Sequence, residues 1–130
     1  MSDLYRQIIL DHYKHPLNKG KLINPDVIIE ESNPLCGDNI DMYLKIKNGE
    51  LKDISFEGKG CALSIATTSI LTEEIKGKKI EDIKKIGREE VYALLGIDVS
   101  PARTKCVMLS LATVKKGIFE YETKQQKTKK

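Results

Sequence analysis

The sequence contains three cysteines, and the residues around each of them suggest that the three thiols act together in one site. Cys36 lies in the segment NPLCGD, which consists of residues that favour a turn between strands. Cys61 follows a Gly-x-Gly sequence at the predicted start of a helix, where the helix dipole and backbone N–H groups favour a thiolate. Cys106 comes after Arg103 and Lys105, two cations that also favour a thiolate. We therefore predict one thiolate site, able to bind a metal or to react with sulfur.

The spacing of the cysteines is not that of a zinc finger. The sequence has no C-x-x-C pair, so the fold would have to assemble a site from distant segments, and a thioredoxin-like redox motif is not expected. A tetrahedral site needs a fourth ligand, and Asp38 can reach the same metal from the turn that carries Cys36. Two alternatives stay open: Asp38 only stabilises its turn, and the cysteines are unrelated core residues.

Composition is typical of a single-domain cytoplasmic protein. The 130 residues fit one domain, 40% of them are hydrophobic and 32% are charged. No apolar run is long enough to cross a membrane, and the N-terminus lacks the basic and apolar segments of a secretory signal. An odd number of cysteines disfavours a disulfide framework. We expect a cytoplasmic chain with reduced thiols and no membrane partner.

The net charge of +3 is concentrated at the C-terminus, where four lysines lie in the last seven residues. A nucleic-acid-binding domain needs basic residues spread over a folded face, so we do not expect a nucleic-acid partner. We predict one domain over residues 1–122 and a basic, disordered tail over residues 123–130.

Hydrophobic periodicity predicts an α+β fold, in which a small three-stranded antiparallel sheet packs against several helices, including an N-terminal helix and a long C-terminal helix. The expected helices cover 2–14, 61–75, 80–86, 88–95 and the segment from Ser100-Pro101 onward, and the expected strands cover 27–29, 40–47 and 51–57. Asn48-Gly49 predicts a hairpin turn between the second and third strands. The residues expected to face the core from the last helix are Val107, Leu111, Val114 and Ile118.

Four segments together resemble the U-type iron–sulfur cluster assembly family, which includes the IscU scaffolds, the N-terminal part of NifU and the SufU proteins. These segments are LYR with DHY near the N-terminus, NPLCGD, FEGKGC with the small-residue helix after it, and PARTKC. The family fold is α+β, in agreement with the periodicity. The resemblance implies that Cys36, Cys61 and Cys106 are the family's three ligands, with Asp38 as the aspartate beside the first cysteine.

Proteins of this type accept persulfide sulfur from a PLP-dependent cysteine desulfurase. The resemblance implies an iron–sulfur cluster assembly protein that builds a transient [2Fe–2S] cluster and transfers it to apo-proteins. The alternative is a zinc-dependent sulfurtransferase of the SufU type, which binds Zn²⁺ and relays persulfide. A second alternative is a structural zinc-binding domain that serves only partner binding. A scaffold is favoured over an enzyme.

Two departures from the family patterns bear on this choice. Lys105 stands where IscU scaffolds carry a histidine, as in the SufU type, yet Cys61 and Cys106 are only 45 positions apart (106 − 61), as in the shorter IscU arrangement. Segment 99–103 does not match the chaperone-recognition motif of IscU scaffolds, so an Hsp70-type partner is doubtful. We interpret Cys106 as the persulfide acceptor, because Arg103 and Lys105 lie beside it. Lys105 would balance negative charge there, unless it is simply a solvated lysine.

Overall fold

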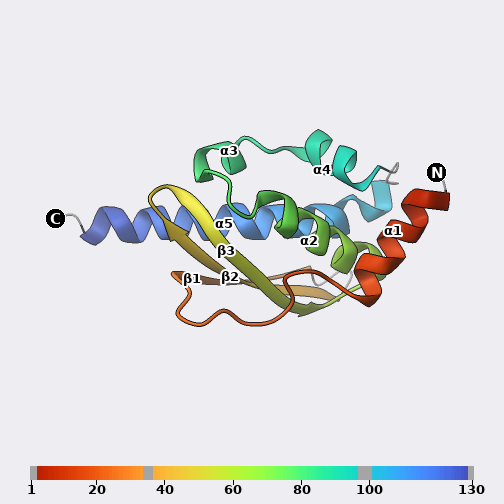
Figure 1. The fold of residues 1–130 in the computed structure, drawn as a ribbon, viewed down its shortest axis with the longest axis horizontal. Coiled ribbons are helices and arrows are strands. Elements are labelled where there is room, and N and C mark those ends of the chain that lie inside the picture. Colours follow the sequence, from red (N-terminus) through yellow and green to blue (C-terminus); the bar gives the residue numbers. More distant parts are fainter. Residues whose placement is uncertain (1–2, 34–36, 97–100, 129–130) are drawn as a thin grey trace.

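The structure is a computed structural model that describes residues 3–33, 37–96 and 101–128. One helix comes first, three strands follow, and the rest of the described chain is mainly helical (Figure 1). The elements in chain order are α1 (Asp3–Lys14), β1 (Val27–Asn33), β2 (Asp38–Lys47), β3 (Glu50–Lys59), α2 (Ala62–Ile75), α3 (Ile80–Lys84), α4 (Arg88–Leu95), the 3₁₀ turn η1 (Pro101–Arg103) and α5 (Thr104–Thr128). The predicted α+β class is confirmed.

The strands form an antiparallel meander in the order β1-β2-β3. Asn48 and Gly49 join β2 to β3 with φ angles of 55° and 75°, the left-handed values that a tight hairpin turn requires, so the predicted turn is confirmed. β2 begins at Asp38, two residues before the predicted start, because Asp38 pairs with Asn33 of β1. This longer strand brings a candidate ligand to the end of the sheet.

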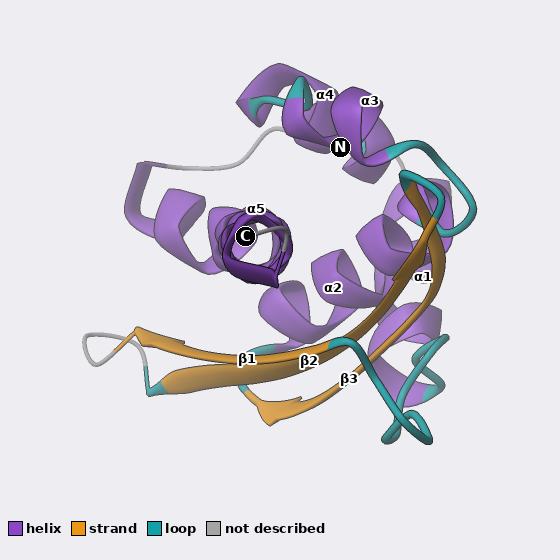
Figure 2. Cartoon of the chain, turned by 90° about the vertical axis from the view of Figure 1, so that its left-hand side faces the viewer, coloured by secondary structure: helices purple, strands orange, loops and turns teal. Residues whose placement is uncertain are grey.

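Helices α2, α3, α4 and α5 lie on the concave side of the curved sheet (Figure 2). α5 runs along the length of the molecule and contacts β1 and β2, while α2 lies between β3, α5 and α1 (Figure 1). Loop residues pair with the outer edge of β3, where the N–H of Gly20 donates to the carbonyl of Phe56 at 2.8 Å and the N–H of Phe56 donates to the carbonyl of Asn18 at 2.9 Å. The core therefore lies between the sheet and the two helices that carry Cys61 and Cys106.

α2 is buried almost all round, and not only along one apolar stripe. Ala66 is fully buried, but Leu63 and Ile70 are only partly buried, and the serines and threonines of the helix are buried instead. The reason is position: α2 packs against a strand and three other helices. Small side chains let these neighbours approach closely.

α5 confirms its predicted core face, since Val107, Leu111, Val114 and Ile118 are each at most 2% exposed. The α-helix begins at Thr104, after the 3₁₀ turn η1, while Ser100 lies outside the described residues. At its other end α5 continues to Thr128, whereas the sequence predicts disorder from residue 123. Segment 120–128 contains good helix formers and neither Gly nor Pro, which explains the extension. The domain boundary at residue 122 stays a prediction.

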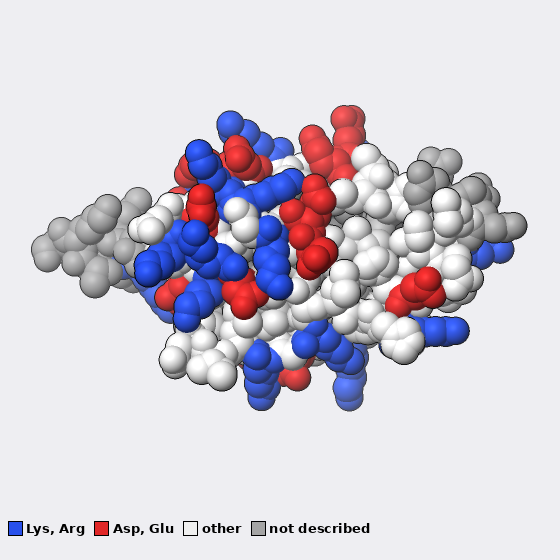
Figure 3. All heavy atoms as spheres, in the orientation of Figure 1, with Lys and Arg blue, Asp and Glu red and all other residues white. Residues whose placement is uncertain are grey.

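Basic and acidic side chains are interspersed on the face seen in Figure 3. Ion pairs account for some of them: Lys78 pairs with Glu74 at 2.9 Å, and Lys84 pairs with Glu81 and Glu122. In the part of the chain that the structure describes, no helix has the length and apolar character needed to cross a bilayer.

The contact between α5 and the sheet depends on Gly117, because a Cβ at this position would lie 2.6 Å from Cδ1 of Leu44. We expect Gly117→Leu to lower the free energy of unfolding by about 1–3 kcal/mol through overpacking, despite leucine's better helix propensity. Chemical denaturation measures the change. Ala112→Leu, on the exposed side of the same helix, should change it by less than about 0.5 kcal/mol. Equal effects of the two substitutions would contradict the close packing.

Candidate metal centre

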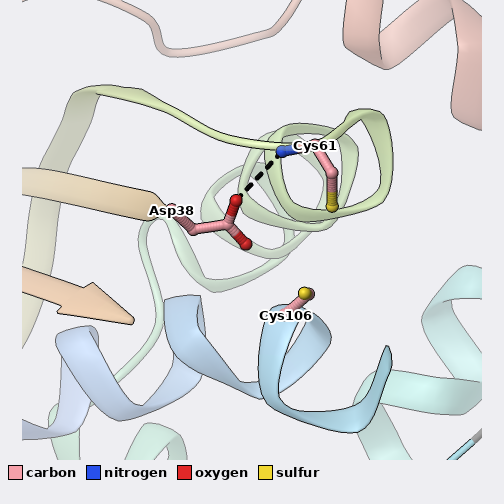
Figure 4. Close-up of side chains that lie close together, drawn as sticks. All are labelled: Asp38, Cys61 and Cys106. Atoms are coloured by element: carbon pink, nitrogen blue, oxygen red, sulfur yellow. Dashed lines mark hydrogen bonds between the residues drawn. The ribbon is translucent and has the colours of Figure 1, made fainter. Parts of the chain in front are cut away.

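Three predicted ligands converge where β2, α2 and α5 meet (Figure 4). Asp38 is the first residue of β2, Cys61 directly precedes α2, and Cys106 lies in the first turn of α5. One carboxylate oxygen and the two Sγ atoms lie within 4.8 Å of one another. Cys36 lies outside the described residues, so its place in the site stays a prediction.

Cys61 is the N-cap of α2, as the sequence predicts. Its Sγ accepts a hydrogen bond from the backbone N–H of Ser64 at 3.4 Å. A cysteine at this position faces the unpaired N–H groups and the positive end of the helix dipole, which both attract a thiolate. Its side chain is partly exposed, so it is within reach of a reactant.

Asp38 has one structural and one unpartnered oxygen. The residue is 1% exposed, and its Oδ1 accepts a hydrogen bond of 3.0 Å from the N–H of Cys61. Its Oδ2 is buried, and no group in residues 3–33, 37–96 or 101–128 forms a hydrogen bond with it. Oδ1 thus bonds the backbone of a residue 23 positions away rather than that of its own turn, while Oδ2 remains available to a cation. A buried carboxylate oxygen without a partner is unfavourable, so its position calls for an explanation.

Gly60 makes this approach possible, and sequence reasoning missed it. A Cβ at Gly60 would lie 2.7 Å from Oδ1 of Asp38, too close for any side chain. The available signal was a glycine at the end of a strand and directly before a cysteine, a position that often marks close backbone approach. Only glycine lets the carboxylate reach the N–H of Cys61.

Cys106 is buried, although it lies beside two cations in the sequence. It is 4% exposed, and Ser110 and Thr113 on the same helix face are also buried. α5 packs against α2, whose buried residues also include serines and threonines. Arg103 and Lys105 are exposed. Adjacent positions on a helix point in different directions, so the charge-balancing role of Lys105 stays a prediction.

The donor set fits zinc or an iron–sulfur cluster. Thiolates bind both, and a carboxylate completes many zinc sites. Zinc–sulfur bonds of about 2.3 Å place tetrahedral ligand atoms roughly 3.7 Å apart, so the described atoms need to approach by roughly 1 Å at most. The buried, unpartnered Oδ2 of Asp38 supports the fit, because a cation would supply its missing partner.

Residues 4–128 match the family model of the NifU-like N-terminal domain. The chain belongs to this family. It is 39% identical to the zinc-dependent sulfurtransferase SufU of Bacillus subtilis, covering 94% of each chain. It is 36% identical to the iron–sulfur cluster assembly scaffold protein IscU 1 of Archaeoglobus fulgidus, covering 98% of this chain and 82% of that one.

The fold is also shared with a solved structure. The N-terminal part of a nitrogen-fixing NifU-like protein from Brucella abortus superposes with a TM-score of 0.78, covering 94% of this chain and 96% of that one at 24% identity. The predicted family is therefore confirmed, and its members carry names of both the scaffold and the sulfurtransferase kinds.

Because the two oxygens of Asp38 have different roles, we expect Asp38→Asn to change the free energy of unfolding in opposite directions with and without zinc. The amide keeps an acceptor for the N–H of Cys61 but removes a buried charge. We expect the free energy of unfolding in a chelator to rise by about 1–3 kcal/mol. With zinc present the parent should be the more stable of the two proteins, because it binds the ion more tightly than Asp38→Asn does. Denaturant titrations under both conditions test this.

Asp41→Asn is the matched control, since Asp41 lies three positions along β2 and points to the other face of the sheet. Its response to zinc should equal that of the parent. If Asp38→Asn gains as much stability from zinc as the parent does, Asp38 is not a ligand.

Proposed function

We propose that this protein acts in cytoplasmic iron–sulfur cluster assembly. In this proposal it accepts sulfur from a PLP-dependent cysteine desulfurase, builds a transient [2Fe–2S] cluster on its three cysteines, and transfers the cluster to apo-proteins. The observation that carries the proposal is the convergence of Asp38, Cys61 and Cys106, with a carboxylate oxygen that has no hydrogen-bond partner among the described residues. Family membership supports the same assignment.

The ligand set suits a cargo that must leave. Three thiolates with one carboxylate bind less tightly than four thiolates, because the carboxylate is a weaker and harder ligand. Cys36, Cys61, Cys106 and Asp38 would hold the group. A bound metal keeps the thiolates deprotonated, and thus ready to accept sulfur. The buried position of Asp38 and Cys106 limits the access of water to the site.

We assign Cys106 as the first sulfur acceptor. Its thiolate attacks the terminal sulfur of the desulfurase persulfide, a new S–S bond forms, and the desulfurase cysteine leaves as a thiolate. The exchange needs no external electron donor. Arg103 and Lys105 are exposed near this turn, and neither forms an ion pair within the described residues. They would attract the negatively charged group.

A zinc-dependent sulfurtransferase is the second candidate, and its support is specific. The sulfurtransferase from Bacillus subtilis is 39% identical to this chain, and the sequence resemblance assigns Lys105 to that type. The alignment lengths favour the scaffold. The SufU alignment spans 139 positions, more than the 130 residues of this chain, so SufU carries residues that this chain lacks. The IscU 1 alignment spans 127 positions and 98% of this chain, which leaves almost no room for insertions.

Anaerobic reconstitution with iron, cysteine and a cysteine desulfurase separates the candidates. We expect a cluster with visible absorption that transfers to an apo-ferredoxin. Tight zinc binding with no cluster, and faster desulfurase turnover, would instead favour the sulfurtransferase. If zinc removal unfolds the protein and no sulfur is ever loaded, the structural zinc domain is correct.

Cysteine-to-serine substitutions test the ligand set and the acceptor. Each of Cys36→Ser, Cys61→Ser and Cys106→Ser should lower the bound metal content, because each removes a thiolate ligand. Incubation with desulfurase and cysteine, followed by mass spectrometry, should show an added sulfur atom in Cys61→Ser but not in Cys106→Ser. The reverse result would make the partly exposed Cys61 the acceptor. Unchanged metal content in one variant would remove that cysteine from the site.

A further inference from the structure

The buried hydroxyl groups of α2 and α5 differ in whether they have a hydrogen-bond partner. Threonines donate back to the carbonyl one turn earlier: Thr67 to Leu63 at 2.6 Å and Thr113 to Leu109 at 2.7 Å. Ser64 and Ser110 do not. Each is 1% exposed, and its hydroxyl oxygen has no hydrogen-bond partner.

These unpartnered groups are concentrated at one place. Among the described residues, four buried side-chain atoms lack a hydrogen-bond partner: Oδ2 of Asp38 and the hydroxyl oxygens of Ser55, Ser64 and Ser110. Asp38 belongs to the metal centre, and the two helical serines follow its cysteines by one turn. Ser55 is different, because it alternates with the inward-facing Ile54 and Phe56 and so points to the other side of the sheet.

Helix geometry directs the side chain of each of the two serines toward a cysteine of the site. Ser64 follows Cys61 by three positions and Ser110 follows Cys106 by four, the spacings that share a helix face. Side chains on a helix point toward its N-terminus, which here is the direction of the cysteine. The N–H of Ser64 already donates to Sγ of Cys61.

The hydroxyl of Ser64 also borders the gap above Gly60. The position of a Cβ on Gly60 lies 2.7 Å from Oδ1 of Asp38 and 3.3 Å from Oγ of Ser64. One small space therefore adjoins both the carboxylate and the hydroxyl. Ser64 therefore lies beside Asp38 at the candidate metal centre.

We propose that Ser64 and Ser110 are positioning residues of the metal centre. Their hydroxyls donate hydrogen bonds to the thiolates of Cys61 and Cys106 when a metal ion is bound. A buried hydroxyl without a partner destabilises the metal-free fold, and a thiolate is an acceptor that removes this cost. The inference rests on the metal centre of the proposed function, and it adds two residues that hold the ligands in place.

A purely structural role is the competing explanation. A rotated hydroxyl of Ser110 would donate to the carbonyl of Cys106, as Thr113 does to Leu109. Removing such a bond would weaken the fold and leave the metal unaffected. The two explanations therefore differ in the metal-free stability and in the properties of the bound ion.

The test compares Ser64→Ala and Ser110→Ala with Ser55→Ala. All three remove one buried, unpartnered hydroxyl, but only the first two lie beside the ligands. Zinc affinity is measured by chelator competition, and Co²⁺ serves as the spectroscopic probe. We expect about tenfold weaker zinc binding for each site variant. The thiolate-to-cobalt charge-transfer band should move to lower energy, because a thiolate without a donor gives up electrons more easily. Ser55→Ala should leave both readouts unchanged.

Denaturant titration of the metal-free proteins completes the test. All three variants should be at least as stable as the parent, since each loses an unsatisfied group. Unchanged zinc affinity and cobalt spectrum in both site variants would overturn the proposal, whether or not their metal-free stability falls. Equal changes in Ser55→Ala would overturn it as well, by showing a general loosening of the fold. If the parent binds neither zinc nor cobalt, the metal centre of the proposed function fails, and this inference fails with it.

Discussion

One hydrogen bond holds the site in its shape, the bond from the N–H of Cys61 to Oδ1 of Asp38. The N–H of an N-cap residue often finds its partner within the same helix, as the N–H of Gly87 does with Glu90 in α4. At Cys61 the partner comes from the start of a strand. The bond therefore joins the sheet to α2 and fixes a thiol and a carboxylate relative to each other. The lack of a side chain at Gly60 is the condition for it.

Because of this hydrogen bond, the two oxygens of the Asp38 carboxylate have different roles. Oδ1 serves the fold, and Oδ2 is left for a ligand. Three of the four buried, unpartnered side-chain atoms in the described residues lie in or beside the three-residue cluster. Buried polar atoms without a hydrogen-bond partner lower the stability of a fold. They occur at functional sites, where they can bind a ligand. The core under the rest of the sheet, with Met42, Leu44 and Phe56 fully buried, supplies the compensating stability.

The sequence predicted the parts of the structure that local rules determine. The hairpin at Asn48-Gly49 and the inward face of α5 follow from backbone freedom and from periodicity. The turn chemistry around Asp38 allowed two roles, and only the tertiary contact with Cys61 shows that its oxygens differ. The burial of Cys106 and of the serines in α2 was missed, because small polar residues in a helix do not reveal what packs against them. Those contacts are made between segments far apart in the chain.

The distance along the chain between the ligands has a consequence for biosynthesis. Cys61 follows Asp38 by 23 positions (61 − 38), and Cys106 follows by a further 45 (106 − 61). A chain emerging from the ribosome presents its N-terminal part first. The nascent chain contains the sheet and α2 before α5 has been synthesised, so Cys106 is the last of the three candidate ligands to be made. A nascent chain therefore offers an incomplete donor set. Under the proposed function, docking of α5 completes the metal centre, and it would tie metal loading to the completion of synthesis.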